Sequence, residues 1–88
     1  QPLALGGIGD AFAELEQFSD ALQYYEKALS HSDNKITYPR YLRKAGLVAL
    51  SLGDNKTASE YFSIIKDEFS DGVEANNIDA LLGQVSKR

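Results

Sequence analysis

The residues of this 88-residue chain that are best suited to bind another molecule form a small basic cluster. Arg40, Arg43 and Lys44 stand in the stretch 36–53, which contains no acidic residue, although the chain carries a net charge of −4. Guanidinium groups bind carboxylates through paired, charge-assisted hydrogen bonds. The cluster therefore predicts contacts with carboxylates, either on a partner or on this chain. We expect no nucleic acid partner, because an acidic molecule lacks the basic face that a phosphate backbone requires.

The sequence contains few residues that could support catalysis or bind a metal ion. The chain contains no cysteine and a single histidine, His31. The glycine-rich run 6–9 follows no predicted strand and precedes no Lys–Ser/Thr pair, so it does not match a phosphate loop. A calcium loop starting at Asp67 fails because Phe69 and Ile78 stand where oxygen ligands are needed. We expect no catalytic residue, no metal and no cofactor.

The elements that position the basic cluster are predicted to be helices. Apolar residues recur at intervals of three and four in every part of the chain, and no segment alternates with the period of a strand. The predicted apolar faces are Leu5, Ile8, Phe12 and Leu15; Phe18, Ala21, Leu22, Tyr25, Ala28 and Leu29; Tyr38, Tyr41, Leu42, Ala45, Ala49 and Leu52; Ala58, Tyr61, Phe62, Ile65 and Phe69; and Ala75, Ile78, Leu81, Leu82 and Val85. Because the connections within each pair are short, consecutive helices must pack antiparallel.

Residues typical of helix ends divide these stretches. Pro39 suits the first turn of the third helix, where its missing N–H is not needed. Gly53 is predicted to end that helix, and Asp54 is predicted to cap the next one. Asp71 and Glu74 have the spacing of a capping box, which predicts the start of the fifth helix at about residue 72.

A repeated pair of small residues indicates that the helices form a duplicated unit. Gly9 and Ala21 are separated by the same interval as Gly46 and Ala58. A small residue on one helix that faces a small residue on the next lets the two backbones approach closely. The sequence therefore predicts two helical hairpins of the same kind, which is the pattern of a repeat protein.

This pattern resembles the tetratricopeptide repeat, a helix–turn–helix unit of about 34 residues. The first copy matches it through Leu5, Ile8, Gly9, Phe12, Leu15, Phe18, Ala21, Tyr25 and Ala28, and the second through Leu42, Ala45, Gly46, Ala49, Leu52, Gly53, Ala58 and Phe62. The resemblance implies an all-α fold, a short right-handed α-solenoid. Its single domain would consist of repeat one (3–35), repeat two (37–71) and a capping helix (72–86). Because the sequence starts at Gln1 and contains no methionine, we expect it to be part of a larger protein.

The chain departs from the family pattern at several positions. The closing proline is missing from both copies, near Asp33 and Asp71, and Ile65 replaces a small residue. The family's carboxylate clamp of Lys, Asn and Arg is not present either, because Gly6, Asp10 and Leu47 stand at three of its positions. The resemblance therefore carries no ligand over to this chain.

In the family, the first helix of each hairpin lines the inner surface of the array. That implies an inner surface built from Leu3, Gly6, Asp10, Ala13, Glu14, Arg40, Arg43, Leu47, Leu50 and Ser51. Leu47 and Leu50 are apolar residues outside the predicted core face, and an exposed apolar pair flanked by arginines suits the binding of a partner peptide. The alternative is that Leu47 or Leu50 is covered by the first helix or by the capping helix. Arg40 and Arg43 could likewise be solvated or pair with Asp10 and Glu14.

The sequence thus favours a protein-interaction module that binds a peptide or helix of a partner, and it does not favour an enzyme. The alternative is a structural or self-association domain at the end of a longer array, so a homo-oligomer is possible. No apolar run reaches the length of a membrane-spanning helix, so we expect no direct membrane insertion by this segment. Its composition and the ending Phe69-Ser70 resemble bacterial tetratricopeptide proteins of the cell envelope.

Overall fold

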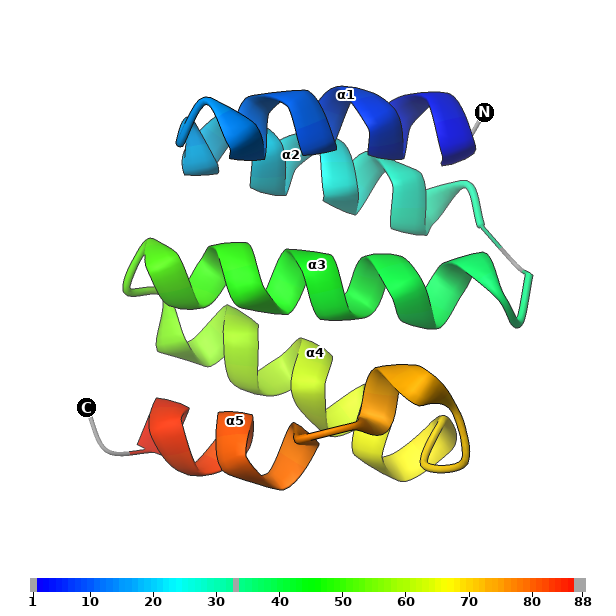
Figure 1. Cartoon of the computed structure of the whole chain (residues 1–88), viewed down its shortest axis with the longest axis vertical. Coiled ribbons are helices and arrows are strands. Elements are labelled where there is room, and N and C mark those ends of the chain that lie inside the picture. The colour runs from blue at the N-terminus through cyan, green and yellow to red at the C-terminus, as the bar shows by residue number, and fades with distance from the viewer. Residues whose placement is uncertain (1, 33, 87–88) are drawn as a thin grey trace.

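The computed structural model describes residues 2–32 and 34–86, with side chains from residue 4 onward, and within these ranges every regular element is a helix (Figure 1). The predicted all-α class is therefore confirmed. The side chain of Leu3 and the whole of Asp33 lie outside the described residues. The elements are α1 (Pro2–Glu14), α2 (Phe18–Ser30), α3 (Thr37–Ser51), α4 (Asn55–Glu68), the 3-10 helix η1 (Val73–Ala75) and α5 (Ile78–Ser86).

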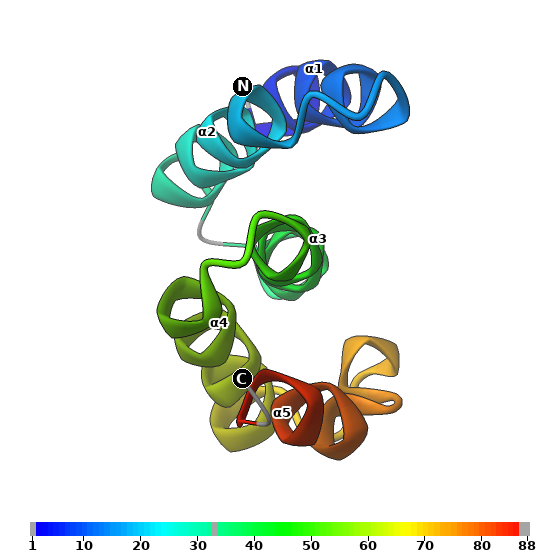
Figure 2. The same ribbon diagram turned by 90° about the vertical axis from the view of Figure 1, so that its left-hand side faces the viewer.

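Consecutive helices run in opposite directions and pack against one another, as Figure 1 shows. Figure 2 shows that α1, α3 and α5 lie on one side of the molecule and α2 and α4 on the other, with α3 in the middle. We call the side of α1, α3 and α5 the inner side. On this side α3 is flanked by α1 and by η1, and both of these elements contact it.

Both hairpins are closed by the same contact between a glycine and an aromatic ring. A Cβ atom built on Gly9 would lie 2.7 Å from Cδ1 of Tyr25 and 3.3 Å from the carbonyl oxygen of Ala21. A Cβ atom on Gly46 would lie 2.5 Å from Cε1 of Phe62. Tyr25 and Phe62 are buried at 2% and 0% exposure. A close approach at the glycine is thus present in each hairpin. The predicted contact with a small residue is shown only in the first, where Ala21 lies near Gly9, whereas the atoms nearest to Gly46 belong to Phe62.

The connection between α3 and α4 forms as its residues predict. Gly53 has a φ of +79°, in the left-handed region where glycine avoids the strain of a Cβ atom. The side chain of Asp54 accepts a hydrogen bond of 3.2 Å from the backbone N–H of Thr57 and so caps α4. Pro39 lies in the first turn of α3.

The predicted start of the fifth helix near residue 72 is wrong. The helix α5 begins at Ile78, and the short η1 precedes it. Gly72 is extended, with φ −88° and ψ 165°, and no side chain caps η1, so the expected capping box between Asp71 and Glu74 does not form. Asn77 has a φ of 66°, a left-handed conformation that separates η1 from the start of α5.

The core includes residues from four helices and is densest around α3, which contacts both α2 and α4. Three residues of the predicted apolar faces nevertheless remain exposed: Ile8 at 42%, Leu15 at 67% and Leu52 at 43%. Ile8 is exposed because α1 forms the edge of the molecule in Figure 1, and no described element covers its outward face. Leu15 lies in the turn that follows α1. Leu52 follows the last helical residue of α3.

Candidate protein-binding surface

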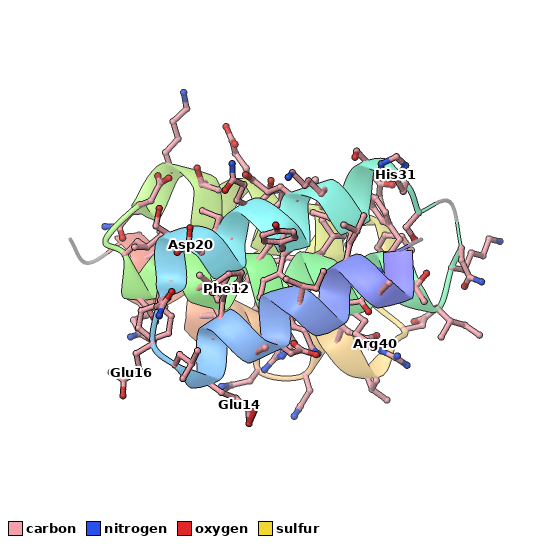
Figure 3. All side chains as sticks on the ribbon, turned by 90° about the horizontal axis from the view of Figure 1, so that it is seen from above. Phe12, Glu14, Glu16, Asp20, His31 and Arg40 are labelled. Carbon is pink, nitrogen blue, oxygen red and sulfur yellow. The ribbon has the colours of Figure 1, made fainter. Side chains whose placement is uncertain are left out.

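One face of α3 is exposed on the inner side. Arg40, Lys44, Leu47 and Ser51 recur at the three- and four-residue spacing that places side chains on one face of a helix. We call these four residues the α3 strip. Leu47 is 38% exposed, Arg40 and Ser51 are exposed, and Lys44 is half-buried. Figure 3 shows Arg40 pointing to the side of the molecule that α1 occupies.

An ion pair joins the α3 strip to α1. The ammonium nitrogen of Lys44 lies 2.9 Å from both carboxylate oxygens of Asp10. The hydroxyl of Tyr25 on α2 donates a hydrogen bond of 2.5 Å to the same carboxylate. Asp10 therefore links three helices and is already engaged within the chain. The expected intramolecular partners of Asp10 were Arg40 and Arg43, whereas the structure uses Lys44, one helical turn after Arg40.

The pKa of the Tyr25 hydroxyl is raised above its ordinary value. Burial is the largest cause, and the hydrogen bond to Asp10 is the second. The hydroxyl therefore stays protonated and remains a hydrogen-bond donor at neutral pH. A similar pair links α2 to α4, where Tyr61 donates a hydrogen bond of 2.5 Å to Glu26. The pKa of Tyr61 is raised as well, mainly by burial and secondly by this hydrogen bond.

The other flank of the α3 strip is held by Arg43. Its Nη1 atom donates hydrogen bonds of 2.9 Å and 2.8 Å to the backbone carbonyl oxygens of Glu74 and Asn76. These carbonyls belong to η1 and the residue after it. Arg43 is half-buried and fixes the η1 segment against α3. The side chain thus shapes the edge of the surface, a role that the sequence alone did not indicate.

The expectation that Leu50 and Gly6 line an exposed surface is wrong. Leu50 is only 8% exposed and belongs to the core cluster that includes Ile78, Leu81 and Val85 of α5. Gly6 is buried because the ring of Tyr41 lies directly over it, in the space that a Cβ atom would fill. The helix α3 is packed on two sides, so its buried arc is wider than the single stripe assumed from its sequence.

Glu14 and Arg40 remain exposed, as expected of surface residues. Figure 3 shows both pointing to the side of α1, with Glu14 toward one end of the helices and Arg40 toward the other. Val73 on η1 is 82% exposed and adds an apolar residue that the sequence did not single out. The charged and leucine residues predicted for the inner surface were Asp10, Glu14, Arg40, Arg43, Leu47 and Leu50. Of these, Arg40, Leu47 and Glu14 are available to a partner on the inner side.

A separate cavity of about 290 Å³ lies at the connection between α2 and α3. Its lining residues are Ser32, Asn34, Lys35, Tyr38, Glu68 and Phe69. None of the predicted binding residues lines it.

No protein-family model matches this chain, and no curated protein or solved structure is found to be similar to it. Within residues 2–32 and 34–86, no three His, Asp or Glu side chains are placed to hold a metal ion together. No helix in the described part of the chain is long and apolar enough to cross a membrane. The function is therefore argued from the geometry of the surface.

Proposed function

We propose that this chain is a protein-interaction module of the tetratricopeptide-repeat kind, which binds a peptide or helix of a partner on its inner side. The repeated glycine–aromatic contacts of Gly9 with Tyr25 and of Gly46 with Phe62 support this assignment. The placement of the first helix of each hairpin on the same side supports it as well.

The observation that carries the proposal is the exposed Leu47 in the middle of a surface whose two flanks are held in place. Lys44 joins α3 to α1 through Asp10, and Arg43 joins α3 to η1. A surface that is already ordered loses little conformational entropy when it binds. Leu47 supplies apolar area at its centre, and the exposed Arg40 supplies a positive charge.

The spacing of these two residues defines the chemistry of the partner. Arg40 and Leu47 are two helical turns apart, which corresponds to about 10 Å along α3. An extended peptide covers this distance in about three residues. We therefore expect a partner segment in which an acidic residue for Arg40 and an apolar residue for Leu47 stand about three positions apart, or about seven positions apart if the segment is a parallel helix.

A selection of random peptides displayed on phage tests this proposal. The wild-type chain should enrich peptides that combine an acidic and an apolar residue at one of these spacings. The variant Arg40→Glu should lose the preference for the acidic residue, because it places a like charge opposite it. The proposal fails if the enriched peptides carry no such pair, or if Arg40→Glu enriches the same sequences as the wild type.

A further inference from the structure

The inner side carries two exposed charges of opposite sign, which are separated along the helices. Arg40 lies in the first turn of α3, and Glu14 is the last residue of α1. Both side chains are exposed, and Figure 3 shows them on the same side of the molecule, toward opposite ends of the helices. Among the described residues, neither of the two forms an ion pair. Both charges are therefore available to a partner.

The ion pair between Asp10 and Lys44 sets the level of Glu14 along α3. The helices α1 and α3 run in the same direction, because each is antiparallel to α2 (Figure 1). Glu14 follows Asp10 by four residues, and Leu47 follows Lys44 by three residues. Glu14 therefore stands at about the level of Leu47, on the helix that flanks the α3 strip.

The surroundings of Tyr25 place the Glu14 carboxylate near the junction of α1 with α3. The Tyr25 hydroxyl donates its hydrogen bond to Asp10, the residue that joins these two helices. Burial is the largest cause of the raised pKa of Tyr25, and the negative charge of Glu14 is one of the smaller causes. The charge of Glu14 thus acts on the same part of the inner side as the ion pair of Asp10.

The other charges of this surface are engaged within the chain. Lys44 is paired with Asp10. Arg43 is half-buried, and its Nη1 atom donates to two backbone carbonyl oxygens at η1, on the opposite flank of α3. Leu47 is therefore the exposed residue at the centre of the surface. A partner meets a positive charge at one end, and an apolar side chain with a negative charge beside it at the other.

We propose that the partner segment carries both charges: an acidic residue for Arg40 and a basic residue for Glu14, with the apolar residue for Leu47 next to the basic one. This inference rests on the proposed function and adds the second charge to it. Arg40 and Glu14 are about 12 Å apart along the helix axes, which an extended chain covers in about four residues. The segment reads acidic–x–x–apolar–basic if it runs parallel to α3, and the reverse if it runs antiparallel.

The two charges determine which segments bind more than how tightly they bind. Exposed ion pairs add little affinity, whereas a like charge in the same place excludes a wrong partner. Glu14 therefore rejects a segment that carries a second acidic residue beside its apolar one. The net charge of −4 acts in the same sense, because it repels a uniformly acidic peptide and does not repel a segment without net charge.

Two phage libraries test the second charge. One displays Asp-x-x-Leu-x and the other x-Leu-x-x-Asp, with every x randomised. The wild type should enrich Lys and Arg over Asp and Glu by about 5-fold at the position that follows Leu in the first library or precedes it in the second. Glu14→Lys should reverse this preference. Glu60→Lys is the matched control, because it makes the same exchange at an exposed residue of α4, on the other side of the molecule, and it should select like the wild type.

The salt dependence and a third library separate the possible failures. The preference for Lys and Arg should disappear in about 1 M salt, where the Debye length is about 3 Å. A library with Ala in place of Asp and Leu should be retained less than the first two, and equal retention overturns the proposed function together with this inference. If the first two libraries are retained better but show no basic preference, or if Glu14→Lys selects like the wild type, the second charge alone is overturned.

Discussion

Replacement of Gly46 by alanine tests whether the glycine–aromatic contact sets the packing of each hairpin. A Cβ atom at this position would lie 2.5, 2.9 and 3.0 Å from three carbon atoms of the Phe62 ring. The ring is fully buried and has no solvent space into which to move. Helix propensity alone favours alanine over glycine by about 1 kcal/mol, whereas overpacking a core costs about 1–3 kcal/mol. The expected net result is a destabilisation of up to about 2 kcal/mol.

The matched control for this experiment is Gly83→Ala in α5, where an added Cβ atom meets nothing within 4 Å. This variant should be more stable than the wild type by about 1 kcal/mol, from helix propensity alone. Urea unfolding followed by circular dichroism gives both free energies of unfolding. The difference between the two variants isolates the overpacking cost of about 1–3 kcal/mol. If Gly46→Ala is as stable as Gly83→Ala, the close contact between α3 and Phe62 does not exist as described.

Three further predictions concern the polar links of the molecule. Asp10→Asn should lower the pKa of Tyr25 toward its ordinary value, though not fully because burial is the larger cause, and an unchanged spectrophotometric titration of the tyrosines would contradict this. Arg43→Ala should lower the free energy of unfolding by about 1–2 kcal/mol and speed amide hydrogen exchange in residues 73–77, because it removes two charge-assisted hydrogen bonds. Arg40→Ala is the control, and equal exchange rates in the two variants would argue against the role of Arg43. The folded-state pKa values of Tyr25 and Tyr61 are raised, so their contribution to stability is complete below about pH 10 and is lost as the pH rises further, since the unfolded chain releases these protons first. This prediction is refuted if the urea concentration at the midpoint of unfolding does not decrease when the pH is raised from about 9 to about 11. Tyr61→Phe should make that decrease smaller.

The helices and the duplication could be predicted from the sequence because both depend on local spacing. The apolar period sets the face on which each helix packs, and the interval between Gly9 and Ala21, repeated at Gly46 and Ala58, sets where two helices approach. Gly53 and Asp54 could be placed because a left-handed turn and a helix cap each depend on a single residue type.

The exposed residues and the ion pair between α1 and α3 could not be predicted in this way. They depend on which neighbour covers each helix face, and the apolar periodicity of a sequence does not contain that information. Leu50 is buried because α3 packs on two sides. Ile8 is exposed because α1 packs on fewer neighbours, and Leu15 is exposed in the turn that follows α1. The pairing of Asp10 with Lys44 depends on the register between α1 and α3, which is fixed only when Tyr41 packs on Gly6. The start of α5 at Ile78 follows from the backbone of Gly72 and Asn77 rather than from the polar residues near them.

The most direct test of the proposed function is a fluorescence anisotropy titration of one selected acidic–apolar peptide against three forms of the chain. Leu47→Glu should weaken binding by roughly 30-fold or more, as expected when a central apolar contact is lost. Leu15→Glu, which makes the same exchange at an exposed leucine in the turn that follows α1, should bind like the wild type, and all three forms should show equal helical content. Equal affinity of Leu47→Glu and the wild type for the peptide would contradict the assignment of the α3 strip as the binding surface.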